Sequence, residues 1–88
     1  MTDDRTTRVK RLIYRSWHRG TKELDLLLGP FAQAELSTCA ANDLADYEAL
    51  LEAPEPLLYD LLTGKASAPP FDTPVLRRIH AFHRRPRA

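Results

Sequence analysis

Two histidines near the C-terminus are the first candidates for chemistry. His80 and His83 are i, i+3 neighbours, so both rings would project from one face of a helix and would be close enough to share a metal ion. Structural zinc needs four ligands, however, and no other histidine, cysteine or acidic residue adjoins the pair in sequence. We therefore expect two ordinary helical histidines and no metal site.

Cys39, the single cysteine, is the second candidate. A reactive thiolate needs a base or cation beside it, whereas a cysteine among apolar neighbours usually acts as a small, inert hydrophobic residue. It cannot form an internal disulfide, which favours a reducing compartment. The sequence also contains no Gly-rich phosphate loop, no nucleophile elbow and no paired cysteines. We expect a binding protein and not an enzyme.

The N-terminal segment carries a strip of arginines at helical spacing: Arg8, Arg11, Arg15 and Arg19. Such a strip can lie along a phosphate backbone, or it can be a solvated helix face. A helix-turn-helix protein would place its base-reading residues in the next segment, but that segment offers Glu23 and Asp25, which repel phosphates. Nucleic-acid binding remains a rival hypothesis to protein binding.

The segment from Arg19 to Glu23 joins two predicted helices and concentrates charge on a corner. Gly20 suits the end of the first helix, because glycine accepts a positive φ, and it also suits the N-cap of the second. Glu23 would then occupy N3 and complete half of a capping box. Capping thus explains these residues without any partner.

Two amphipathic helices position this corner. Residues with apolar spacing define the first helix, which is predicted to end at Gly20: Val9, Leu12, Ile13, Ser16 and Trp17. The second helix follows at once, with Leu24, Leu27, Leu28 and Phe31 at i, i+3, i+4 and i+7. Pro30 lies inside that run, where proline removes a hydrogen bond and clashes with the preceding turn. We expect a kink or an early end there.

Three shorter helices are predicted in the rest of the chain. The third begins near the capping candidates Asn42 and Asp43 and stops before Pro54. The fourth starts at Pro56 and is closed by Gly64. After a loop over 65–72, the fifth follows Thr73-Pro74, an N-cap with a proline at the first helical position, and contains Val75, Ile79 and Phe82. No strand pattern occurs, so the prediction is an all-α fold, a compact five-helix bundle.

Size and charge limit the alternatives. A chain of 88 residues has room for one core, and we predict a single helical domain over 1–88, with an ordered core of about 8–83 and a basic tail over 84–88. Net charge is +1, yet residues 1–22 are basic, 23–64 hold no Lys or Arg, and the end is basic again. No apolar run of roughly 18 residues and no targeting pattern is present. We therefore expect a cytoplasmic protein without a membrane span.

The stretch Arg15-Ser16-Trp17-His18-Arg19-Gly20-Thr21-Lys22-Glu23-Leu24-Asp25-Leu26-Leu27-Leu28 resembles the Arg-Gly-x-x-Glu signature of the succinate dehydrogenase flavinylation and assembly factors. The resemblance covers residues 8–83 in order and spacing. It implies a five-helix bundle that acts as a chaperone. The partner it implies is the flavoprotein subunit of succinate dehydrogenase, and in some bacteria that of fumarate reductase, whose FAD becomes covalently attached to a histidine.

The resemblance also implies a binding site. It assigns partner binding to Arg19, Gly20 and Glu23, with the neighbours Arg15, His18 and Asp25, and with Tyr59 in the fourth helix. Many family members have an Asp and a Trp where this chain has Leu57 and Leu61, which weakens that helix as a contact surface. The chain itself is expected to bind no cofactor tightly and to act on the FAD of its partner. The alternatives are a nucleic-acid-binding module, a general helical adaptor and a flavin transferase with its own FAD site.

Overall fold

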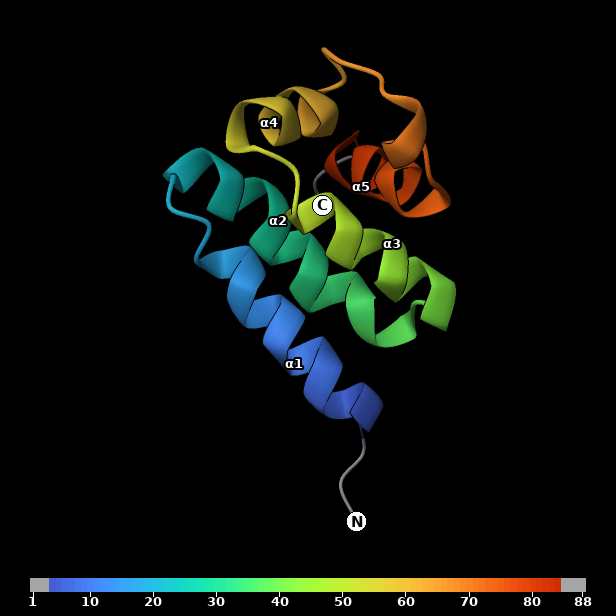
Figure 1. The fold of residues 1–88 in the computed structure, drawn as a ribbon. Helices are drawn as coiled ribbons and strands as arrows, with labels where there is room; N and C mark the ends of the chain where they lie inside the picture. The colour runs from blue at the N-terminus through green and yellow to red at the C-terminus, as the bar shows by residue number, and fades with distance from the viewer. Residues whose placement is uncertain (1–3, 85–88) are drawn as a thin grey trace. The chain divides into compact units, whose positions relative to one another are not determined.

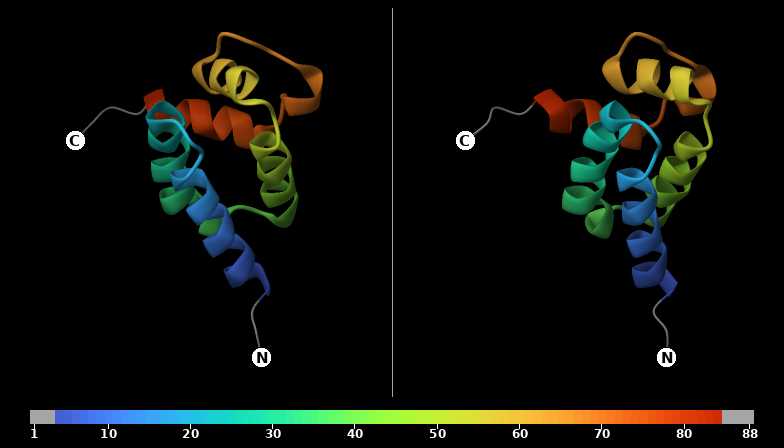
Figure 2. Two further views of the ribbon diagram at one scale, coloured as in Figure 1. Left: turned by 60° about the vertical axis from the view of Figure 1, so that its left-hand side comes forward. Right: turned by 90° about the vertical axis from the view of Figure 1, so that its left-hand side faces the viewer.

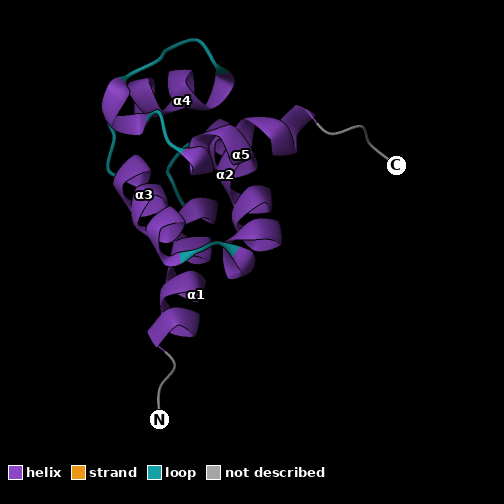
Figure 3. Ribbon diagram, turned by 90° about the vertical axis from the view of Figure 1, so that its right-hand side faces the viewer, coloured by secondary structure: helices purple, strands orange, loops and turns teal. Residues whose placement is uncertain are grey.

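The computed structural model describes residues 4–84, and this part of the chain is all-α, as predicted. It contains five α-helices and two short 3₁₀ turns, with no strand among the described residues (Figures 1 and 3). None of the described helices combines the length and the apolar character needed to cross a bilayer. The backbone contacts divide the chain between Ala40 and Ala41 into two compact units, each described separately below.

The first unit is a pair of helices of equal length. Helix α1 spans Asp4–Trp17, α2 spans Lys22–Glu35, and a 3₁₀ turn, η1, follows at Leu36–Thr38. In both turned views α1 and α2 run antiparallel, side by side (Figure 2). Most residues of the predicted apolar stripes are buried: Val9, Leu12 and Ser16 on α1, and Leu24, Leu28 and Phe31 on α2. Gly29 and Ala32 are buried as well, while the predicted stripe residues Ile13, Trp17 and Leu27 are half-buried.

Helix α1 is longer at its start than the predicted ordered core. It begins at Asp4, where a carboxylate in the first turn suits the positive end of the helix dipole. Arg5 also links this turn to residues 37–39 at the end of the first unit. Its guanidinium donates hydrogen bonds to the carbonyls of Ser37 (3.2 Å) and Cys39. Of the basic tail predicted over 84–88, Arg84 is the last residue of α5, and the rest lies outside the described residues.

A kink or an early end was predicted at Pro30, and the early end is wrong, because α2 continues to Glu35. Proline in a helix interior costs about 3 kcal/mol. Phe31 and Leu36, which follow it, are fully buried, and burying side chains of this size contributes about 1.5–3 kcal/mol each. Packing therefore outweighs the lost hydrogen bond, and the helix persists through the proline.

Trp17 and Gly29 form the closest point of the α1–α2 seam. A Cβ atom built on Gly29 would lie 2.3 Å from Cδ2 of Trp17, a distance that real contacts do not show. The indole Nε1 also donates to Oε1 of Gln33 at 3.2 Å, one helical turn further along α2. The absence of a side chain at residue 29 thus makes room for the indole ring.

The second unit contains α3 (Ala41–Leu51), α4 (Glu55–Thr63), a 3₁₀ turn η2 (Pro69–Phe71) and α5 (Pro74–Arg84). Gly64 ends α4 with a φ of 80°, as predicted. Thr73 caps α5 as predicted, because its Oγ1 accepts a hydrogen bond from the amide of Leu76 at 3.3 Å. Pro56 is the second residue of α4, one position later than predicted.

The predicted capping residues of α3 are inside the helix. Because α3 begins at Ala41, Asn42 and Asp43 fall in its first turn and not at the N-cap. A carboxylate in the first turn is stabilised by the helix dipole, and Asp43 also lies 4.0 Å from a guanidinium nitrogen of Arg78 on α5. A second link in this unit joins α5 to α4, where Nε2 of His80 lies 2.8 Å from the carbonyl oxygen of Leu61.

Candidate functional site

The candidate site lies in the first unit, at the α1–α2 corner, which we define as residues 18–25. The prediction that α1 ends at Gly20 is wrong by three residues. The helix ends at Trp17, and the amide of His18 donates to the carbonyl of Arg15 at 3.2 Å to close the last turn. Gly20 does have the positive φ that was expected, 107°, so it permits the change of direction between the helices.

Thr21, and not Gly20, is the N-cap of α2. Its backbone is extended, with φ −125° and ψ 145°, and its Oγ1 accepts a hydrogen bond from the amide of Leu24 at 3.3 Å. Threonine supplies the side-chain acceptor that glycine lacks. Glu23 therefore occupies N2, and the predicted half capping box is wrong. The exposed Glu23 side chain forms no hydrogen bond or ion pair with any residue of 4–84.

Asp25 forms a hydrogen bond that links the two ends of the corner. Its Oδ1 accepts a hydrogen bond from the backbone amide of Arg19 at 2.7 Å, across six residues of chain. A carboxylate acceptor makes this bond stronger than one between neutral groups. Asp25 is half-buried, so the structure gives this predicted binding residue a clear structural contact.

The predicted cations of the corner differ in their surroundings. Arg19 is half-buried, and its Nε atom is buried without a hydrogen-bond partner among the described residues. Arg15 is also half-buried, one turn earlier on α1. His18 is exposed, and its ring stacks on Tyr14 with centroids 4.0 Å apart and planes 21° apart. Its Nδ1 lies 2.7 Å from the carbonyl oxygen of Tyr14, so this nitrogen carries the proton and donates.

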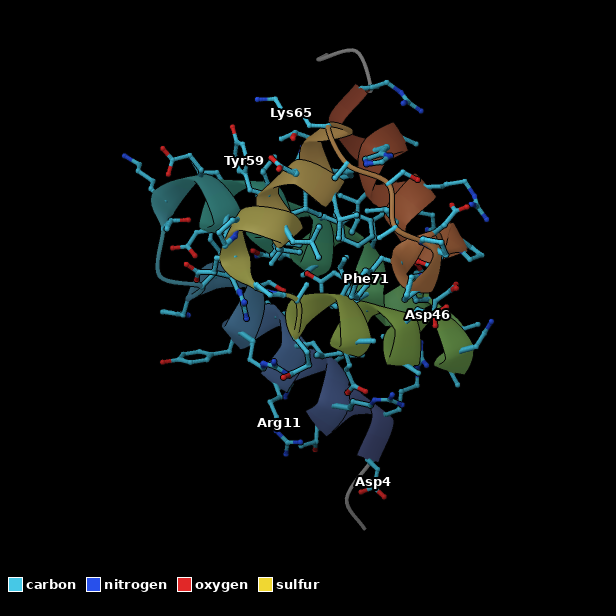
Figure 4. All side chains as sticks on the ribbon, turned by 45° about the horizontal axis from the view of Figure 1, so that its top comes forward. Asp4, Arg11, Asp46, Tyr59, Lys65 and Phe71 are labelled. Carbon is cyan, nitrogen blue, oxygen red and sulfur yellow. The ribbon has the colours of Figure 1, made fainter. Side chains whose placement is uncertain are left out.

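Tyr59 belongs to the second unit, so the corner is built without it. The side chain is half-buried, and Nζ of Lys65 lies 5.7 Å from the centroid of its ring (Figure 4). Of the two leucines of α4 that depart from the resemblance, Leu61 is fully buried and Leu57 is half-buried. The residues that carry the signature therefore lie together in the first unit, whereas Tyr59 is a residue of the second unit.

Two exposed apolar residues were missed by the sequence reasoning. Tyr14 is 65% exposed and Leu26 is 54% exposed, and they are the large hydrophobic residues that the described part of the chain leaves open to solvent. The sequence did carry a signal for each. Tyr14 falls on the polar arc of α1 between Arg11 and His18, and Leu26 lies off the i, i+3, i+4, i+7 stripe of α2.

The remaining candidates for chemistry are engaged or isolated. His80 is hydrogen-bonded to the Leu61 carbonyl, and the Sγ of the buried Cys39 donates to the carbonyl of Glu35 at 3.4 Å. Within residues 4–84 no three His, Cys, Asp or Glu side chains gather closely enough to hold a metal ion. The corner itself offers an arginine, a close backbone approach at Gly20 and a free carboxylate at Glu23. These groups can form hydrogen bonds and ion pairs with another polypeptide.

Comparison with known proteins gives a family match and several relatives. The family model Sdh5, described as the flavinator of succinate dehydrogenase, matches residues 10–83. A protein of Acetobacter pasteurianus named FAD assembly factor SdhE is 44% identical over 78 residues, which are 88% of this chain and 72% of that protein. No solved structure gives a significant match.

Mitochondrial proteins are also similar. Succinate dehydrogenase assembly factor 2 of Dictyostelium discoideum is 39% identical over 71 residues, 80% of this chain and 50% of its own length. Succinate dehydrogenase assembly factor 2-B of Drosophila melanogaster is 35% identical over 76 residues, 83% of this chain and 49% of its own length. The chain thus spans about half the length of these two relatives.

Proposed function

Because this chain belongs to the Sdh5 family of succinate dehydrogenase flavinators, we propose that it is an assembly factor that binds the flavoprotein subunit of succinate dehydrogenase and promotes covalent attachment of FAD. The observation that carries the proposal is the match over residues 10–83, supported by the relative named FAD assembly factor SdhE. Within the matched segment the Arg19-Gly20-x-x-Glu23 signature is complete.

The factor contributes geometry and not a reacting group. Attaching FAD to a histidine requires the flavin ring and an imidazole of the flavoprotein to be held in reacting orientation, which by itself lowers the barrier substantially. A protein that binds one conformation of its partner increases the population of that conformation by its differential affinity. Docking at the flavoprotein thus stabilises the arrangement in which the bond forms.

The corner supplies the contacts for this docking. Arg19, whose Nε has no partner within residues 4–84, donates to a carboxylate or backbone carbonyl of the flavoprotein. Gly20 lets the partner backbone approach closely because it has no Cβ atom. Glu23 accepts a hydrogen bond or an ion pair. Arg15 and His18 flank this contact, and Asp25 keeps the Arg19 backbone in place.

Cofactor and location complete the proposal. The chain holds no FAD tightly, and the flavin on which it acts belongs to its partner. Its place is the cytoplasm, in line with its similarity to the bacterial SdhE, whereas the relatives from Dictyostelium and Drosophila are named as mitochondrial. Fractionation of the source cells, with the chain detected by antibody, checks the location.

The test of the function uses cells that lack this gene. The flavoprotein subunit is denatured, separated on a gel and examined for flavin fluorescence, which only covalently attached FAD retains. We expect fluorescence to be lost on deletion, restored by the wild-type gene and not restored by a Gly20→Val variant. Undiminished fluorescence in the deletion strain would refute the proposal.

A further inference from the structure

The outer face of α1 presents an aromatic and basic surface that leads to the corner. Arg11, Tyr14 and His18 are spaced i, i+3 and i+7, so they project from the same side of the helix, and the backbone bond from His18 to Arg15 extends the last turn far enough to include the histidine. All three residues are exposed. We call this set the α1 strip.

The two rings of the strip contact each other although both face solvent. Tyr14 and His18 stack at 4.0 Å, and the hydrogen bond from His18 Nδ1 to the Tyr14 carbonyl fixes the imidazole orientation. An aromatic pair on a surface brings apolar area with few rotatable bonds, so little conformational entropy is lost when a partner covers it. Tyrosine is enriched at protein interfaces for this reason.

The strip is basic and continuous with the corner. Helix α1 carries five cations against one carboxylate, Asp4. Arg11 forms no ion pair with any residue in the described range 4–84. His18 belongs both to the strip and to the α1–α2 corner, so the two surfaces adjoin at this residue. The exposed carboxylate of Glu23 at the same corner disfavours a phosphate backbone as the occupant.

We propose that the α1 strip is a second docking surface for the flavoprotein, an inference that rests on the proposed function, and that it takes an acidic segment bearing an apolar or aromatic side chain. That side chain packs on the Tyr14 and His18 rings. A carboxylate of the same partner segment pairs with the guanidinium of Arg11, which lies one turn before Tyr14 on α1. The pair adopts the bidentate geometry that arginine favours. The strip sets how long the complex lasts, and its charge sets how fast the complex forms.

The test measures association and dissociation of this chain with the purified flavoprotein subunit by biolayer interferometry at two salt concentrations. Tyr14→Ala should dissociate about tenfold faster than the wild type, because a central interface tyrosine is lost, while Tyr14→Phe keeps the ring and should dissociate like the wild type. Arg11→Glu should associate several-fold more slowly at low salt, with the difference shrinking at high salt.

Arg84→Glu is the matched control, because it reverses one exposed charge at the end of α5, a helix of the second unit that belongs neither to the strip nor to the corner. It should bind like the wild type. Wild-type kinetics for both Tyr14→Ala and Arg11→Glu, with binding still abolished in Gly20→Val, would overturn the strip and leave the proposed function standing. A wild-type chain that does not bind the flavoprotein at all would overturn both.

Discussion

At Gly20 the backbone has a φ of 107°, a value that residues with a Cβ atom rarely adopt. Gly64 has a φ of 80° and nothing within 4 Å of the position of an added Cβ atom. The two glycines therefore share a conformational requirement, but only Gly20 is in the candidate site. This pairing separates the effect of backbone strain from the effect of lost docking.

Replacing either glycine by alanine should lower the free energy of unfolding by about 1–2 kcal/mol, because a Cβ atom is strained at positive φ. Urea unfolding followed by circular dichroism measures this. Only Gly20→Ala should also weaken binding to the flavoprotein. Equal binding by the two variants would mean that Gly20 has no role at the interface beyond its conformation.

Substitutions of Asp25 test how much its hydrogen bond to the Arg19 amide contributes to stability. Asp25→Ala removes the acceptor of the 2.7 Å bond from the Arg19 amide and should cost about 1.5–3 kcal/mol of stability, the range for hydrogen bonds to charged groups. Asp25→Asn keeps an oxygen in place and should cost less. Urea unfolding of both variants gives the comparison, and an alanine variant as stable as the wild type would show that the bond does not hold the corner.

At the scale of the helices, the seam between α1 and α2 depends on residue 29 being glycine. Alanine in a helix interior is normally favoured over glycine by about 1 kcal/mol. In this chain the added methyl group would collide with the Trp17 indole, whose carbon atoms lie 2.3–2.6 Å from its position. For Gly29→Ala, the clash therefore predicts a loss of stability, whereas helix propensity predicts a gain.

Gly29→Ala should destabilise the chain by about 1–3 kcal/mol, the usual cost of overpacking. In a Trp17→Ala background the same substitution should be neutral or stabilising, because the ring is gone. Thermal or urea unfolding of the four proteins in this double-mutant cycle gives the coupling energy directly. A stabilising Gly29→Ala in the wild-type background would contradict the close packing of the seam.

Much of the helical architecture follows from the sequence pattern. Apolar spacing located all five helices, and Gly64 and Thr73 were recognised as terminal residues because their conformational and capping roles are local. The corner was harder. Gly20 and Thr21 are both acceptable N-caps, and only the three-dimensional path of the chain decides between them. The persistence of α2 through Pro30 likewise depends on tertiary burial, which spacing does not reveal.

The residues of the candidate site were named from the signature, but their local contacts were not foreseen. The signature identified Arg19, Gly20 and Glu23, and the structure places them on one corner. It did not reveal that Asp25 binds the Arg19 backbone, or that the His18 ring stacks on Tyr14. These features depend on side-chain orientation at the end of a helix, where the regular 100° periodicity breaks down.

At the scale of the whole molecule, the features that point to a partner are concentrated in the first unit. The basic helix α1, the exposed Tyr14 and the signature corner all precede Ala40. In the second unit, Leu61 is fully buried, so its side chain offers no contact to a partner. We infer that docking depends chiefly on the first unit.

The most direct test of the central claim uses purified components: the apo-flavoprotein subunit, free FAD and this chain. Covalent flavin is measured over time as the fluorescence that stays with the protein after acid precipitation. The account predicts that the wild-type chain accelerates covalent attachment, that Gly20→Val does not, and that Gly64→Ala does. A rate of attachment that is the same with and without the wild-type chain would contradict the account.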